Sequence, residues 1–76
     1  MKYLIVIEKT NTGYSAYSPD LNGCVATGST KEETEFNMKE AMEFHLEGLQ
    51  LGNQYIPHPQ AYSNYIELKA PLSATI

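Results

Sequence analysis

The fold is decided by residues 13–49, which read GYSAYSPDLNGCVATGSTKEETEFNMKEAMEFHLEGL. In order along the chain, these residues predict a strand, a turn, a second strand and a helix, with almost no connecting loop. Turn-forming residues and a helix cap fill the short spaces between the apolar runs. Such compactness over half the chain favours a fixed structural module.

The first part of this stretch predicts two strands. Residues 14–18 alternate loosely with the period of a strand, and residues 24–27 form a shorter one. Pro19 ends the first of these strands. Asn22-Gly23 follows it, and because this dipeptide adopts positive φ angles easily, we expect the chain to reverse there.

The second part predicts a long amphipathic helix that begins after Thr30. The Thr30 hydroxyl can cap the helix while Glu33, three residues on, reaches back in a capping box. Gly52-Asn53 is expected to end the helix. Phe36 lies nearly opposite the apolar face, where an aromatic ring is either exposed or covered by another chain. At 100° per residue the apolar face contains Thr34, Met38, Ala41, Met42, His45 and Leu49.

The flanking segments predict two more strands. Residues 2–9, KYLIVIEK, form a β-branched and aliphatic run of strand length that should pair with residues 14–18 as a hairpin. After the helix, Pro57 and Pro59 forbid helix and favour an extended connection. Residues 65–69, YIELK, then alternate as a final strand.

The predicted fold class is therefore α+β with the element order β-β-β-α-β. We expect a four-stranded mixed sheet in the order 3-2-1-4, with one helix packed on one face. Ile66 and Leu68 of the final strand should point inward. Residues 1–70 form a single domain, and residues 71–76 a loose C-terminal tail. The other sheet face stays uncovered and is a candidate interaction surface.

Composition narrows the classes of partner. The chain has 76 residues, 42% of them hydrophobic and 18% charged, which is typical of a small folded domain that a partner subunit helps to stabilise. All five basic residues are lysines, and the net charge is −4. Direct binding to nucleic acid or a membrane is therefore not expected, and a basic protein partner fits better. Without a signal peptide or long apolar span, we expect a cytoplasmic protein.

No set of residues predicts catalysis, a cofactor or a metal. Cys24 is the sole cysteine and is expected to be a small buried residue. His45 could be a ligand, a pH switch or a packed imidazole, and packing is favoured because the helix offers no second ligand at metal spacing. His58 is expected to be an exposed loop residue. Asp20 is the only aspartate, and a role in a turn suits it better than metal-dependent chemistry.

The motifs together resemble those of the HicB-type antitoxin domain. The residues that carry the resemblance are GYSAYSPDLNGCVATG at 13–28, TKEE at 30–33 and EAMEFHLEGL at 40–49. Ile56-Pro57 and the closing strand fit the same pattern. The resemblance covers residues 3–68, and several consecutive blocks make it specific.

This resemblance implies a partly degraded ribonuclease H-like fold that binds and inhibits a small basic HicA-type toxin, which cleaves mRNA. It implies that the antitoxin is not itself an enzyme. Family members usually add a C-terminal DNA-binding domain, which we do not expect in this chain. The chain departs from the family pattern at Asn22, Glu35, Phe36 and His58.

Four residues are predicted to contact a partner: Tyr14, Tyr17, Asp20 and Phe36. The tyrosines come from a strand that borders the uncovered face, and Phe36 lies on the outer side of the helix. The alternative interpretation is a homo-oligomer without a toxin partner, in which the uncovered sheet face is the dimer interface. A residual metal-dependent nuclease is a third hypothesis, and the scattered carboxylates argue against it.

Overall fold

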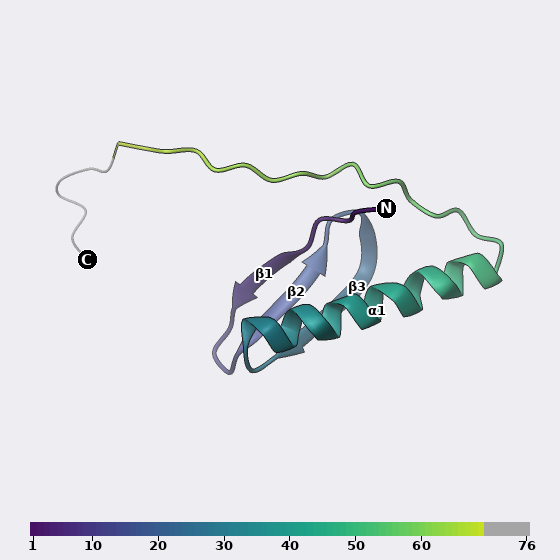
Figure 1. Cartoon of the computed structure of the whole chain (residues 1–76), viewed down its shortest axis with the longest axis horizontal. Helices are drawn as coiled ribbons and strands as arrows, with labels where there is room; N and C mark the ends of the chain where they lie inside the picture. The colour runs from purple at the N-terminus through teal and green to yellow at the C-terminus, as the bar shows by residue number, and fades with distance from the viewer. Residues whose placement is uncertain (70–76) are drawn as a thin grey trace.

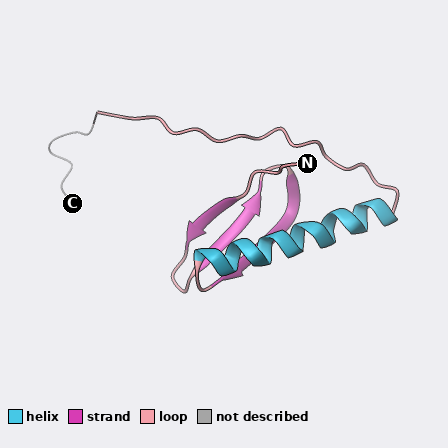
Figure 2. Cartoon of the chain, viewed as in Figure 1, coloured by secondary structure: helices cyan, strands magenta, loops and turns pink. Residues whose placement is uncertain are grey.

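A computed structural model of the chain describes residues 1–69 and shows a small sheet with one long helix across it (Figure 1). The strands are β1 (Val6–Lys9), β2 (Tyr14–Ser18) and β3 (Leu21–Gly28), and the helix is α1 (Lys31–Leu51). The element order is therefore β-β-β-α. Helix α1 lies on one face of the sheet (Figure 2).

The sheet is antiparallel, with the strand order β1-β2-β3. In the first hairpin Val6 lies opposite Tyr17 and Lys9 opposite Tyr14. The turn between these strands is closed by a hydrogen bond of 2.8 Å from the Thr10 N–H to the Gly13 carbonyl. The hairpin predicted from sequence is confirmed, although its ladder begins only at Val6, which pairs with Tyr17 near the end of β2.

The second reversal differs from the prediction. Ser18 pairs directly with Leu21, so the chain turns at Pro19-Asp20 and not at Asn22-Gly23. The residues after Leu21 form an irregularity in β3, since Tyr17 pairs with Val25 and the register shifts there. Gly23 takes a φ of +79° within this irregularity. The positive-φ signal was correct, but it marks a bulge-like break in the strand.

The prediction of a four-stranded mixed sheet in the order 3-2-1-4 is wrong. Residues 62–69, here called the arm, are extended but pair with no strand within the described part of the chain. Ile66 and Leu68, predicted to point inward, are exposed. The segment before the arm runs back from α1 past the N-terminus, and the arm continues beyond the sheet (Figure 1). The predicted tail at residues 71–76 lies outside the described residues.

The helix begins and ends where the sequence predicts. The Thr30 hydroxyl accepts a 3.0 Å hydrogen bond from the Glu33 N–H. The Glu33 carboxylate, however, accepts from the Ser29 N–H at 2.6 Å and the Ser29 hydroxyl at 2.7 Å, one residue earlier than a capping box requires. At the other end Asn53 adopts a φ of +54°, and the Gly52 N–H donates to the Gly48 carbonyl.

The Glu33 cap predicts a pH-dependent contribution to stability. The Ser29 backbone and then its hydroxyl donate to the carboxylate and hold the pKa of Glu33 below its ordinary value. A lowered pKa stabilises the fold above the unfolded-state pKa, and this contribution is lost as the pH falls through the folded-state pKa. Urea denaturation should therefore show wild type more stable than Glu33→Gln at pH 7, with the difference vanishing in acid. Parallel pH profiles would contradict this.

The core lies between α1 and the β2–β3 side of the sheet. Its buried apolar residues are Ala16, Leu21, Cys24 and Met38, and Thr34 is buried with them. The predicted apolar face of the helix is confirmed, because Thr34 and Met38 are buried and its other members are half-buried. Leu46, which the prediction missed, also packs against the core. The helix contacts β1 far less than β3, so the β1 margin of the sheet is only partly covered.

Candidate protein interface

The face of the sheet opposite α1 carries an apolar row across all three strands. Strand alternation turns Ile7, Ala16 and Ala26 toward the core, and so turns the neighbouring residues the other way. Val6, Tyr17 and Val25 lie opposite one another in the register and form this row. Tyr17 is 42% exposed and Val25 65%. We call these three residues the outer row.

Tyr14, predicted as an interface residue, lies elsewhere. It has the same strand parity as Ala16, so its ring is on the helix side of the sheet. The Lys9 ammonium lies 5.2 Å from the centre of the Tyr14 ring, a distance suited to a cation–π contact between cross-strand neighbours. Tyr14 is half-buried, and its ring is already in contact with Lys9 of the same chain.

Asp20 anchors the segment that follows the helix. One of its carboxylate oxygens, Oδ2, accepts hydrogen bonds of 2.9 Å from the N–H groups of both Gln60 and Ala61. Nearby, the Tyr3 hydroxyl donates to the carbonyl of Pro57. Bonds to a carboxylate are stronger than those between neutral groups. Asp20 therefore fixes residues 60 and 61, which we call the root of the arm, beside the start of β1.

Phe36 borders a groove between α1 and the N-terminal segment. We call this the β1 groove, and its volume is about 760 Å³. Phe36 is exposed, and it lines this groove together with Tyr3 and Ile5. The full lining is Met1, Tyr3, Ile5, Glu32, Glu35, Phe36, Lys39, Met42, Glu43 and Leu46.

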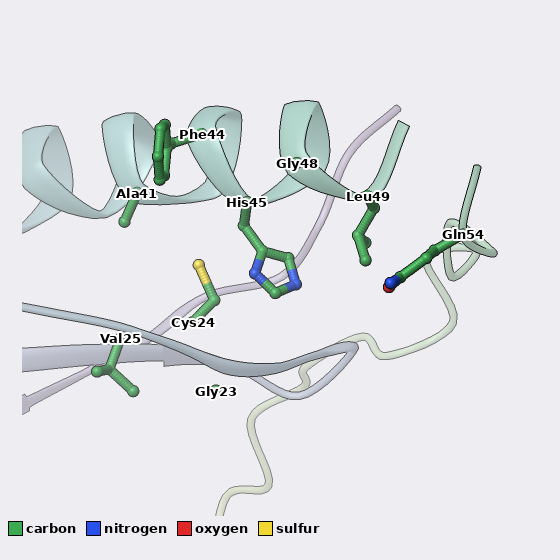
Figure 3. Close-up of a pocket in the computed structure, with 9 residues that line it drawn as sticks. All are labelled: Gly23, Cys24, Val25, Ala41, Phe44, His45, Gly48, Leu49 and Gln54. Atoms are coloured by element: carbon green, nitrogen blue, oxygen red, sulfur yellow. The ribbon is translucent and has the colours of Figure 1, made fainter. Parts of the chain in front are cut away.

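A second hollow of about 440 Å³ lies on the opposite side, between α1 and β3 (Figure 3). The imidazole of His45 projects from the helix toward Cys24, and both residues line this hollow. Burial raises the pKa of the Cys24 thiol, and Cys24 is buried as the sequence predicts. His45 is half-buried between the two layers, in agreement with a packed imidazole. Phe44, at the outer edge, is exposed.

The four predicted interface residues do not converge on one site. Tyr17 lies on the face opposite α1, Tyr14 on the helix side and Asp20 at the root of the arm, whereas Phe36 borders the β1 groove. The sequence interpretation missed Val25, although its position next to Cys24 in an alternating strand was a usable signal. Phe44 lies outside the outer row, at the edge of the second hollow. It is an aromatic residue on the polar side of the helix, and so carries the same signal that singled out Phe36.

The described residues also bear on other kinds of site. Among residues 1–69, no three side chains of the types His, Cys, Asp or Glu come together in a way that could hold a metal ion. The single helix found in that range is too polar to cross a membrane.

Comparison with known proteins gives consistent results. Residues 3–71 match a family model described as a HicB-like antitoxin of bacterial toxin-antitoxin systems. A 14.9 kDa protein from the rep-hol intergenic region of Haemophilus phage HP1 is 41% identical over 66 residues, covering 87% of this chain and 50% of that protein. A UPF0150 protein of Thermoplasma acidophilum is 40% identical over 62 residues, covering 80% of this chain and 90% of that protein.

A chain of known structure is similar to this protein in both fold and sequence. A chain of the HicA3 and HicB3 toxin-antitoxin complex superposes with a TM-score of 0.68 at 35% sequence identity. The similarity covers 78% of the chain described here and 70% of that chain. The chain spans only half the length of its phage relative.

Proposed function

The chain belongs to the HicB-like antitoxin family of bacterial toxin-antitoxin systems, and we propose that it binds a small basic HicA-type toxin and blocks mRNA cleavage by covering the toxin's active surface. It acts by occlusion and not by catalysis, in the cytoplasm where the toxin meets its RNA. The observation that carries this proposal is the similarity to a chain of a solved toxin-antitoxin complex.

The outer row is the surface that suits such a partner best. The partly apolar strip of Val6, Tyr17 and Val25 offers an aromatic anchor flanked by β-branched side chains. Glu8 extends the same face with a negative charge. A protein that acts on RNA needs a cationic surface to attract phosphates, and a chain of net charge −4 complements such a surface.

Tyr17→Ala is expected to weaken toxin binding about tenfold or more, since an exposed tyrosine at the centre of an interface is a frequent hot spot. The measurement is titration calorimetry or co-purification with the small basic protein encoded by the neighbouring gene. Phe44→Ala is the matched control, because it removes an exposed aromatic ring outside the outer row. Circular dichroism of both variants checks that the fold is retained.

Two results would count against this proposal. If the wild-type chain forms no complex with the neighbouring gene product, the chain is not an antitoxin against that product. If Tyr17→Ala and Phe44→Ala weaken the complex equally, the outer row is not the binding surface. Growth rescue of cells that express the toxin gives an independent readout of occlusion.

Self-association is a second candidate function, and it is favoured by the amount of exposed apolar surface. Several large apolar residues are largely exposed, and four of them lie in the arm: Tyr62, Tyr65, Ile66 and Leu68. A chain of 76 residues gains much of its stability from a partner subunit when it leaves this much apolar surface uncovered. Self-association and toxin binding are compatible if they use different surfaces.

A further inference from the structure

The arm has the properties of a strand that lacks its partner. Residues 62–69 are extended, and none of their backbone groups bonds to a strand. Tyr65 is 97% exposed, Ile66 79% and Leu68 80%. In an extended chain Ile66 and Leu68 point to one side, while Glu67 and Lys69 point to the other. This is the pattern of a strand with one apolar face and one polar face.

The outer edge of β1 is open to such a strand. β1 pairs only with β2 among the described residues, so the backbone groups on its other side face no strand. Native edge strands are commonly protected by a bulge, a proline or an inward-pointing charge. The edge of β3 has such protection in its irregularity at Gly23, but residues 3–7 offer only an unbroken apolar run. β1 is therefore the edge available for pairing.

The β1 groove lies beside residues 1–5, which lead into β1, and is suited to the apolar face of the arm. Tyr3 and Ile5 form one wall, and Met42 and Leu46 on α1 form the other. All four pack against the core while remaining only partly buried, so a further strand would complete their burial. The arm and the segment from residue 3 to residue 9 each span about 25 Å when extended at about 3.3 Å per residue.

The anchor at Asp20 separates the arm from the groove of its own chain. Asp20 holds Gln60 and Ala61, and Tyr3 holds Pro57, so the root of the arm is fixed at the start of β1. From there the arm diverges from β1 and leaves the body of the molecule (Figure 1). The same chain thus presents both an unpaired strand and an unfilled groove.

We propose that the arm of each chain pairs with the β1 edge of a second copy, placing Ile66 and Leu68 in the β1 groove, in a reciprocal exchange that forms a dimer. A twofold-symmetric dimer satisfies both arms and both grooves at once, because each surface meets its complement on the partner. This inference concerns the chain alone and stands whether or not a toxin binds.

Sedimentation equilibrium of the full chain across a concentration series tests the proposal. Wild type is expected to be a dimer, and Ile66→Asp to raise the dimer dissociation constant about 100-fold, since the lost burial counts once in each exchanged arm. Phe44→Asp is the matched control, because Phe44 is 78% exposed against 79% for Ile66 and lies outside both the arm and the β1 groove. It should dimerise as wild type does.

A mixing experiment identifies the exchange itself. Phe36→Asp introduces a charge at the rim of the β1 groove, at a side chain exposed enough to leave the fold intact. In the mixed pair with Ile66→Asp, one exchange joins an intact arm to an intact groove, and the other joins the two altered surfaces. A heterodimer held by the intact exchange should therefore form at concentrations where each variant alone, altered in both exchanges, is monomeric. Native mass spectrometry of differently tagged chains detects it.

Three outcomes would overturn the proposal. A wild-type chain that stays monomeric at every concentration excludes the exchange. An unchanged dimer in Ile66→Asp excludes the arm from self-association, and dissociation in Tyr17→Ala instead assigns self-association to the outer row. Failure of the mixed variants to form more heterodimer than either forms homodimer excludes pairing of arm with groove.

Discussion

Gly13→Ala is expected to destabilise the chain by about 3 kcal/mol, because a side chain at this position has no space. A Cβ on Gly13 would lie 2.3 Å from the Gly28 carbonyl oxygen and 3.1 Å from the Ser29 Cα. Both obstacles are backbone atoms, so relief requires the turn before β2 to move away from the end of β3. Gly13 is buried at this junction, where the two hairpins and the start of α1 meet.

Gly48→Ala is the matched control, and it should have the opposite sign. A Cβ on Gly48 would meet nothing within 4 Å, so a side chain fits there without any movement of the neighbouring atoms. Glycine inside a helix is less favourable than alanine by about 0.5–1 kcal/mol, and the substitution should stabilise the chain by that amount. Urea denaturation measures both variants. Equal midpoints for Gly13→Ala and wild type would refute the steric argument.

Local signals in the sequence predicted the local structure well. The cap at Thr30, the helix end at Gly52-Asn53 and the alternation in β2 each depend on residues within a few positions of one another. The second turn was misplaced because two turn signals lie three residues apart, at Pro19-Asp20 and at Asn22-Gly23. Each dipeptide can reverse a chain, and only the pairing of Ser18 with Leu21 decides between them.

Long-range pairing could not be predicted in the same way. Residues 65–69 alternate as a strand does, and this pattern is the same whether the partner strand belongs to the same chain, to another chain or to none. The contact that directs the segment joins Asp20 to backbone groups forty residues later. A carboxylate in a turn gives no sign in the sequence of which distant N–H groups it will accept. The prediction therefore placed residues 65–69 in the sheet of their own chain, whereas the structure pairs them with no strand among residues 1–69.

The candidate interface was predicted only in part for a related reason. Tyr17 could be placed on a face because strand parity is a local property, and Val25 follows from the same rule. Tyr14 and Asp20 are polar or aromatic residues of similar appearance, but their side chains are engaged with Lys9 and with the root of the arm. Residue type shows that a side chain can make contacts, whereas the strand register decides whether contacts within the same chain already engage it.

Met38→Ala is expected to cost about 2–5 kcal/mol, out of a total stability of about 4–11 kcal/mol for a domain of this size. Met38 is 0% exposed and packs from α1 onto a core in which, among residues 1–69, the other buried apolar residues are only Ala16, Leu21 and Cys24. With so few core members, neighbouring side chains cannot refill the cavity. Differential scanning calorimetry should show Tm lowered by roughly 8 °C or more.

Met38→Leu provides the contrast, because it keeps nearly the same volume and should cost less than about 1.5 kcal/mol. If the two variants unfold at the same temperature, Met38 does not hold the helix to the sheet. Loosening α1 should also widen the β1 groove, one wall of which is formed by Met42 and Leu46 on the same helix. Met38→Ala is therefore expected to weaken dimer formation together with folding, whereas Ile66→Asp should weaken the dimer and leave the Tm of the monomer unchanged.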